Sequence, residues 1–327
     1  MKRSFLILIK IAGFLAFFTS SLAQASEQSF VGLVQINQKK LYVEYTKPTG
    51  NKPTLIFLNG LTYSTKNWIG VTSRLRLDGY GILSYDPYGM GTTLLSNPLP
   101  TGPILYSKQV EDLHTLLENL HIPKPYNFVG LSYGGGILAA YATHYPRDIQ
   151  NLILINPYTE FLESQKEWLK EQVANTRFMF PNNPATDEQL IDYFIRELVY
   201  TTYPLAEISS LENPYKLEGI TRLVQGIRMY QPIQEASHIP KGTLHLVISE
   251  QDQYIPQDIY AKYWKAVPDA SKASLTYVKY SEHKLPEAFP RFTYQLLKGI
   301  LDRQPLLFQG NVLEADPVTM KINKKRN

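Results

Sequence analysis

The stretch GLSYG at residues 130–134 decides the fold of this 327-residue chain. It follows an apolar run, Tyr126–Leu131, and precedes a segment with helical spacing, Gly135–Tyr145. A chain that leaves a strand, turns sharply and begins a helix holds the central serine in a strained conformation, so the residues two positions away must lack side chains. The turn exposes the Ser132 hydroxyl at a helix N-terminus, where the helix dipole favours negative charge. We therefore predict that Ser132 is a nucleophile.

Apolar runs rich in β-branched residues predict eight strands along the chain. They are Phe30–Ile36, Leu41–Tyr45, Thr54–Leu58, Gly81–Tyr85, Tyr126–Leu131, Asn151–Ile155, Thr243–Ser249 and Ser274–Tyr280. Segments with helical spacing of apolar residues separate most of the later runs. This alternation predicts an α/β fold in which a mostly parallel eight-stranded sheet is flanked by helices.

One long helical segment interrupts the alternation. Residues 157–239 contain no strong strand pattern but many aromatic residues, which predicts a helical lid inserted after strand 6. The core then divides into a first part, 26–156, and a second part, 240–303. Residues 304–327 have a mixed composition and a basic end, so we expect a loosely held C-terminal tail.

A serine hydroxyl needs a base to act as a nucleophile, and the chain has six histidines. His283 follows the last expected strand, on a loop at the carboxyl end of the sheet, where open parallel sheets bind their ligands. The other candidates lie in or near expected helices or in an apolar strand: His114, His121, His144, His238 and His245. We predict that His283 is the base.

The base needs a carboxylate that fixes its tautomer. Glu250 and Asp252 both follow the seventh expected strand. We predict Asp252 as the acid and keep Glu250 as the alternative. A loop acid or a helix cap is the other interpretation of Asp252.

An oxyanion in the reaction needs two backbone donors. One is expected to be the amide of Tyr133, the residue after the nucleophile. The other is expected from the loop after the third strand, where the Leu61 amide is best placed and Gly60 permits close approach. We therefore predict an oxyanion hole formed by the backbone of Leu61 and Tyr133.

Taken together, these motifs resemble those of the α/β-hydrolase-fold serine hydrolases, over roughly Asn37 to Leu301. In chain order they are Leu58-Asn59-Gly60-Leu61 with Trp68 downstream, Asp86-Pro87-Tyr88-Gly89-Met90-Gly91, Gly130 to Gly134, Asp252 to Pro256, and His283. The order Ser, Asp, His is the order that this fold uses. The resemblance implies the α/β-hydrolase fold, esterase- or lipase-like activity, and no cofactor or metal.

The sequence departs from the family pattern at two positions. Asn59 stands where the family commonly has His before Gly, which can alter the support of the oxyanion loop. Glu250 stands where a glycine is frequent, which is why the choice between Glu250 and Asp252 stays open. Ser132 argues against the dehalogenase and epoxide-hydrolase branches, which use Asp at that position.

The first 25 residues have the pattern of a signal peptide. Lys2 and Arg3 precede an apolar run from Phe5 to Phe18, which only Lys10 interrupts. Small and polar residues follow and end in Ala23-Gln24-Ala25, an A-x-A cleavage site. Lys10 leaves an uninterrupted apolar run well short of the ~20 residues that span a bilayer, which disfavours an uncleaved anchor. We expect export to a bacterial periplasm or medium, with no stable membrane span after cleavage.

The overall composition excludes several classes of function. The chain has no cysteine, so it has no disulfide, thiolate nucleophile or cysteine metal site. Its net charge of +4 falls to +1 without residues 1–25, and nothing indicates nucleic-acid binding.

We therefore expect a small-molecule ester or acyl substrate. An acyltransferase, thioesterase, lactonase or amidase using the same triad is the first alternative. A non-catalytic hydrolase-like binding protein is the second.

Overall fold

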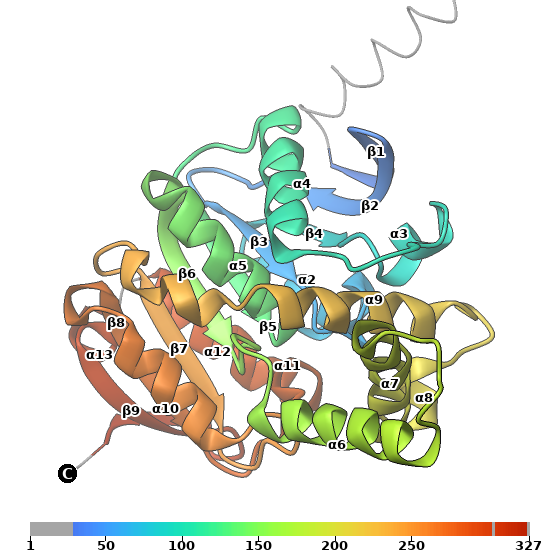
Figure 1. Cartoon of the computed structure of the whole chain (residues 1–327). Helices are drawn as coiled ribbons and strands as arrows, with labels where there is room; N and C mark the ends of the chain where they lie inside the picture. The colour runs from blue at the N-terminus through green and yellow to red at the C-terminus, as the bar shows by residue number, and fades with distance from the viewer. Residues whose placement is uncertain (1–28, 303–304, 326–327) are drawn as a thin grey trace, which may run out of the picture.

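The computed structural model describes residues 29–302 and 305–325. The expected signal peptide, residues 1–25, lies outside the described residues. Within them, one sheet with helices on both faces forms the body, and a group of helices lies at one end of it (Figure 1).

The sheet has ten strands in the order β1-β2-β4-β3-β5-β6-β7-β8-β9-β10. Strands β3 to β9 run parallel to their neighbours, whereas β1, β2 and β10 pair antiparallel. The strands are β1 Phe30–Ile36, β2 Lys39–Thr46, β3 Thr54–Leu58, β4 Gly81–Asp86, β5 Tyr126–Leu131, β6 Ile149–Ile155, β7 Leu244–Ser249, β8 Lys272–Val278, β9 Asn311–Asp316 and β10 Lys321–Lys324. All eight expected strands are present, within two residues at each end, and the mostly parallel sheet is confirmed.

The count of eight strands is wrong, and so is the expectation of a loosely held tail. Strand β9 pairs in parallel with β8, and β10 pairs antiparallel with β9. Leu313 and Ala315 of β9 are fully buried. The sequence did not indicate these strands because both carry several polar residues. Strand β9 lies between β8 and β10 and buries only two of its six residues, and β10 is a four-residue edge strand with no buried residue.

Helices cover the two faces of the sheet because the central strands are buried on both sides. One apolar core lies under α4, α5 and α10, and the other lies under α2, α11 and α12. The helices of the body are η1 Thr65–Trp68, α2 Ile69–Leu77, α3 Gly91–Leu95, α4 Tyr106–Asn119, α5 Tyr133–His144, η2 Pro146–Asp148, α10 Gln257–Ala266, η4 Asp269–Ser271, α11 Leu285–Ala288, α12 Pro290–Leu301 and α13 Pro305–Phe308.

The helices between β6 and β7 form a separate group beside the body (Figure 1). They are α6 Glu163–Met179, α7 Asp187–Thr202, α8 Leu205–Ile208, α9 Lys216–Met229 and η3 Pro232–His238. We call residues 157–239 the cap segment. Helix α7 packs on both α6 and α9, and α9 also contacts α3 of the body.

Parallel register sets the position of the site. Gly130 of β5 lies beside Leu58 of β3 and Leu154 of β6, so these three strands end at the same edge of the sheet. The loops that follow them therefore meet there.

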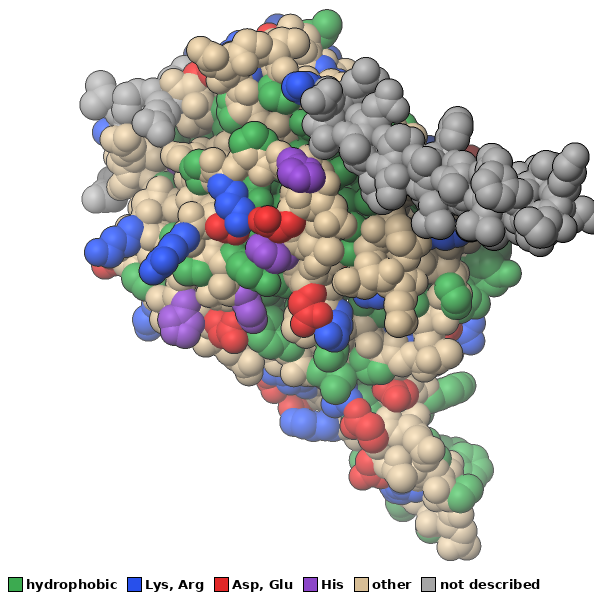
Figure 2. Space-filling model, turned by 90° about the horizontal axis from the view of Figure 1, so that it is seen from above, with side chains coloured by type: hydrophobic (Ala, Val, Ile, Leu, Met, Phe, Trp, Pro, Cys, Tyr) green, Lys and Arg blue, Asp and Glu red, His purple; other side chains and the backbone are tan. Residues whose placement is uncertain are grey.

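The surface has a mixed charge on the face shown in Figure 2, where Lys and Arg side chains are interspersed with Asp and Glu. Among residues 29–302 and 305–325, no helix is both long and apolar enough to cross a membrane. The same part of the chain holds no group of three or more His, Asp or Glu side chains arranged to bind a metal ion.

Candidate active site

Ser132 occupies a strained turn between β5 and α5. Its φ of 52° and ψ of −117° lie outside the regions that side chains favour, which costs of the order of 1–3 kcal/mol. Backbone hydrogen bonds hold the turn: the Ser132 amide donates to the Ile155 carbonyl at 3.0 Å, and its carbonyl accepts from Tyr158 and Gly136 at 2.9 and 3.1 Å. These bonds to α5, to the last residue of β6 and to the chain just after it hold the backbone of Ser132 in this conformation.

Glycines are required on both sides of Ser132 because the backbone packs closely there. A Cβ at Gly134 would lie 2.6 Å from the carbonyl carbon and oxygen of Leu58. A Cβ at Gly130 would lie 2.8 Å from the Cα of Gly135. Real Cβ atoms do not come this close to backbone atoms. The close packing of β3 and α5 at this turn therefore requires glycine at both positions.

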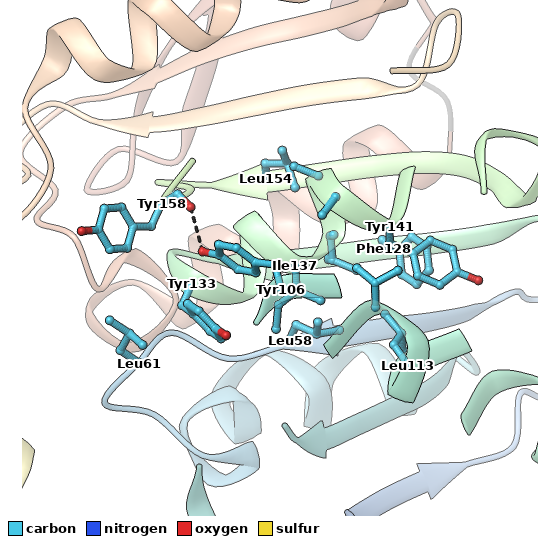
Figure 3. Close-up of a cluster of buried hydrophobic side chains, with 14 of the residues drawn as sticks. Leu58, Leu61, Tyr106, Leu113, Phe128, Tyr133, Ile137, Tyr141, Leu154 and Tyr158 are labelled. Carbon is cyan, nitrogen blue, oxygen red and sulfur yellow. Dashed lines mark hydrogen bonds between the residues drawn. The ribbon is translucent and has the colours of Figure 1, made fainter. Parts of the chain in front are cut away.

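The side chain of Tyr133 anchors the turn in the first core (Figure 3). Its ring stacks on that of Tyr106 with centroids 4.8 Å apart, and the Tyr106 hydroxyl donates to the Tyr158 carbonyl at 3.0 Å. The ring is fully buried. Tyr133 is therefore fixed by its side chain at the first residue of α5, where its backbone amide has no partner within the helix.

His283 and Asp252 form a buried pair. Nδ1 of His283 lies 2.6 Å from Oδ2 of Asp252. Because an ionised carboxylate only accepts hydrogen bonds, Nδ1 is the donor, and Nε2 of the neutral ring is left as an acceptor. This is the tautomer that a general base requires.

Several donors hold Asp252 in place. Its Oδ1 accepts from the amides of Tyr254 and Ile255 at 2.8 and 2.9 Å, and its Oδ2 accepts from the hydroxyl of Tyr260 at 2.5 Å. Burial by itself would raise the pKa of the carboxyl. The hydrogen bond from His283, the charge of this ring in its protonated form, and the hydrogen bonds from Tyr260 and the Ile255 amide hold the pKa of Asp252 below its usual range. Asp252 is therefore ionised at neutral pH.

The loop that carries His283 is fixed by Asn156, the residue that follows β6. The side-chain amide of Asn156 donates to the His283 carbonyl and to the Ser249 hydroxyl, both at 2.8 Å. Its Oδ1 accepts from the Ser249 amide at 2.7 Å. Asn156 thus ties the end of β7 to the histidine loop.

The alternatives to Asp252 and His283 lie elsewhere. Glu250 accepts a hydrogen bond from the Tyr280 amide at 3.4 Å and does not contact His283. His245 lies within β7, next to Ser274, and its pKa is lowered to about 4 by burial. His114 stacks on Tyr145 with ring centroids 3.9 Å apart. The predicted acid and base are brought together, and these alternatives are not.

The predicted oxyanion loop passes directly over Ser132. A Cβ at Gly60 would lie 3.3 Å from the Cβ of Ser132, which shows how close the two segments are. Asn59 supports the loop from below: its Oδ1 accepts from Nε1 of Trp68 at 2.7 Å, and its Nδ2 donates to Asp86 at 3.1 Å. The asparagine that departs from the family pattern therefore has a bracing role.

Ser132 and His283 line the same small cavity of about 20 Å³. This volume holds about one water molecule. The lining residues are Gly60, Leu61, Thr62, Tyr63, Leu131, Ser132, Tyr203, Tyr254, His283 and Lys284. Tyr203 comes from the cap segment, so this segment completes the enclosure of the cavity.

Glu207 of α8 connects the cap segment to the loops around the cavity. Its carboxylate pairs with Nζ of Lys284 at 2.6 Å and accepts from the hydroxyls of Thr62 and Tyr254 at 3.0 and 3.3 Å. The ring of Tyr254 in turn meets the ring of His283 edge-on, with centroids 5.3 Å apart. One carboxylate of the cap segment therefore bonds to the predicted oxyanion, acid and histidine loops.

Three of these supporting residues, Asn156, Tyr260 and Glu207, were not identified as such in the sequence, whereas Asp86 belongs to one of the quoted motifs. Asn156 was detectable as a polar residue directly after a buried strand, and Tyr260 as a residue on the helix that follows Asp252. Asp86 was treated only as part of a structural turn. Glu207 carries no local signal, because its partner Thr62 lies 145 residues away.

A known protein family matches the part of the chain that contains most of these residues. Residues 53–280 match the family described as alpha/beta hydrolase fold. The chain belongs to this family. The α/β-hydrolase fold is thereby confirmed.

Curated relatives of this α/β hydrolase include lipases and a lactonase. The monoacylglycerol lipase ABHD6 of Bos taurus is 27% identical over 151 residues, which cover 43% of each chain. The 3-oxoadipate enol-lactonase 2 of Acinetobacter baylyi is 28% identical over 131 residues, which cover 40% of this chain and 47% of the relative. The match therefore spans less than half the length of these relatives.

Solved structures match a larger share of the chain. The α/β hydrolase MGS-M2 from a Medee basin deep-sea metagenome library has a TM-score of 0.63 and 21% identity, covering 83% of this chain and 97% of the other. The enol-lactonase of Burkholderia xenovorans LB400 has a TM-score of 0.58 and 21% identity, covering 83% and 98%. At these identities the likeness shows the shared fold.

Proposed function

We propose that this α/β hydrolase cleaves a carboxylic ester through a Ser132-His283-Asp252 triad and an acyl-enzyme intermediate. The observation that carries the proposal is that Ser132, at a strained strand-to-helix turn, shares one cavity with His283, whose Nδ1 lies 2.6 Å from Asp252. Nucleophile, base and orienting acid are the minimum set that acyl transfer from an ester to a serine needs.

The reaction begins with Nε2 of His283 removing the proton from the Ser132 hydroxyl as the oxygen attacks the ester carbonyl carbon. Asp252 stabilises the imidazolium that forms. The imidazolium then gives its proton to the alcohol oxygen, which leaves. Water, deprotonated by the same histidine, attacks the acyl-enzyme and releases the acid.

The negative oxygen of each tetrahedral intermediate needs donors that are already in place. We assign the backbone amides of Leu61 and Tyr133 to this role. Contacts elsewhere hold both amides in place. The Tyr133 ring packs on Tyr106 in the core, and hydrogen bonds of Asn59 to Trp68 and Asp86 brace the loop that contains Leu61. Such donors cost no rearrangement at the moment of reaction.

The cap segment, residues 157–239, acts as a lid in this proposal. A cavity of about 20 Å³ cannot admit an ester, so substrate entry requires that the cap segment move. Its aromatic residues suit an apolar group of the substrate.

Export is part of the proposal and is tested separately. The first 25 residues have the charged, apolar and A-x-A regions of a signal peptide. N-terminal sequencing of the protein from the periplasm or medium should begin at Ser26. A protein that is retained with its first residues intact would contradict export and leave the ester chemistry untouched.

Related chemistry on the same triad is the alternative. Among the relatives are an enol-lactonase and a proline iminopeptidase of Clostridium botulinum, the latter 32% identical over 40% of this chain. Lactone or amide cleavage, thioester cleavage or acyl transfer would use the same attack by Ser132. Product analysis with added alcohols separates transfer from hydrolysis.

A p-nitrophenyl ester series from acetate to palmitate tests the proposal. We expect turnover by the wild-type protein and a loss of about 10⁴–10⁶-fold in kcat for Ser132→Ala. Ser73→Ala, on α2 away from the site, is the control and should retain activity. Turnover that persists in Ser132→Ala would refute the triad, and no turnover on any ester would favour the alternatives.

A further inference from the structure

A second cavity lies beside the first, on the other side of the predicted oxyanion loop. Its volume is about 210 Å³, against about 20 Å³ for the cavity beside Ser132. Leu61, Thr62 and Tyr63 line both cavities. The opposite wall comes from the cap segment, between Ser210 and Ile220. The same three residues line both cavities, so a substrate group that extends from Ser132 past Leu61 would enter this space once the cap segment has moved.

One cation in the wall of the second cavity has no counter-ion. Lys216, at the first residue of α9, is half-buried, and its Nζ forms no ion pair or hydrogen bond with any residue in 29–302 or 305–325. Burial lowers the pKa of Lys216, because removal from water disfavours the ammonium. The nearby Glu207 carboxylate opposes this shift but is already bonded to Lys284 and Thr62.

The other charges around the cavity do not compensate Lys216. Lys66 and Glu212 also line it, and they pair with each other at 3.6 Å with both side chains exposed. This leaves one net positive charge.

We propose that the second cavity binds an anionic group of the substrate, a carboxylate or a phosphate, through Lys216. The inference rests on the ester hydrolysis proposed above and adds the substrate class. An apolar chain in this space would desolvate the ammonium further without a partner, which is unfavourable. An anion would instead form a charge-assisted hydrogen bond with it.

Paired substrates that differ only in charge test this inference. One series places the charge on the acyl side, as p-nitrophenyl monoesters of dicarboxylic acids with four to eight carbons. The other places it on the alcohol side, as acetyl esters of ω-hydroxycarboxylic acids. Each substrate is compared with its uncharged methyl ester, and the result is the ratio of kcat/KM for the charged and the uncharged member.

We expect the charged member to be preferred by about tenfold or more at one chain length in one series. Lys216→Gln should reduce this ratio by at least tenfold. Lys170→Gln removes the same charge from an exposed position on α6, where Lys170 pairs with Glu167, and should leave the ratio as in the wild type. No charge preference in either series, or a preference that Lys216→Gln does not reduce, would overturn the inference.

Binding measurements test the anion site in proteins that do not need to turn over an ester. Glutarate and glycerol phosphate are titrated into Ser132→Ala and into Ser132→Ala with Lys216→Gln, by calorimetry. Tighter binding of either anion to the first protein supports the site, and the stronger of the two identifies carboxylate or phosphate. Equal binding to both proteins refutes the anion site even when esters are turned over. Absence of ester turnover by the wild-type protein, with anion binding that depends on Lys216, would contradict the proposed triad chemistry and leave the anion site supported.

Discussion

Substitution of Glu207 by Gln should open the cap segment and speed the modification of Ser132. The cavity beside Ser132 has a volume of only about 20 Å³, so we expect an acylating or phosphonylating reagent to react only when the cap segment has moved. Glu207 bonds this segment to Lys284, Thr62 and Tyr254. Glutamine keeps the shape and one acceptor oxygen but removes the charge.

The size of the effect follows from these contacts. The side chains of Glu207 and Lys284 are 19% and 24% exposed, so water screens their pairing only in part. Hydrogen bonds to a charged group contribute about 1.5–3 kcal/mol, against about 0.5–1.5 kcal/mol between neutral groups. We therefore expect the closed state to lose about 2 kcal/mol, which corresponds to an open fraction up to about 30-fold larger.

The assay is the second-order rate of inactivation by a fluorophosphonate. Glu167→Gln is the matched control, since Glu167 pairs with Lys170 on the exposed face of α6. We expect faster inactivation in Glu207→Gln and the wild-type rate in Glu167→Gln, with thermal unfolding confirming that both are folded.

An unchanged rate in a folded Glu207→Gln variant would show that this carboxylate does not hold the cap segment closed. A slower rate would show that its main role is to hold the loops around Ser132 in place.

Two further predictions concern stability. Burial lowers the pKa of His245 from 6.5 to about 4. The contribution of this neutral side chain to the free energy of unfolding is therefore complete above pH 6.5. It is lost as the pH falls towards 4, by up to about 3 kcal/mol. Urea unfolding at pH 7, 6, 5 and 4.5 should show a smaller decrease in the free energy of unfolding for His245→Asn than for the wild type. An equal decrease with pH in both proteins would contradict a buried, neutral His245. Leu313→Ala, in a fully buried position of β9, should lower the free energy of unfolding by about 2–5 kcal/mol at pH 7. A change below about 0.5 kcal/mol would mean that residues 311–316 are not an integral part of the sheet.

Much of the core could be predicted from the sequence because its signals are local. Apolar runs of five to seven residues marked every strand from β1 to β8, and the glycines around Ser132 marked a turn where the backbone packs too closely for a side chain. The position of His283 after the last of these strands followed from chain order. Strands β9 and β10 were missed because both are rich in polar residues, and β10 is a short edge strand that needs no continuous apolar pattern.

The sequence by itself determined the strand order along the chain, the turn at Ser132 and the two carboxylates near the end of β7. Only the tertiary structure decided between those carboxylates, because the choice depends on which one reaches the histidine loop: Asp252 lies 2.6 Å from His283, and Glu250 bonds to Tyr280 instead. The connection of Glu207 to Thr62, 145 residues apart, was also decided only by folding. Local patterns follow from backbone geometry and burial, whereas such contacts exist only once distant segments pack together.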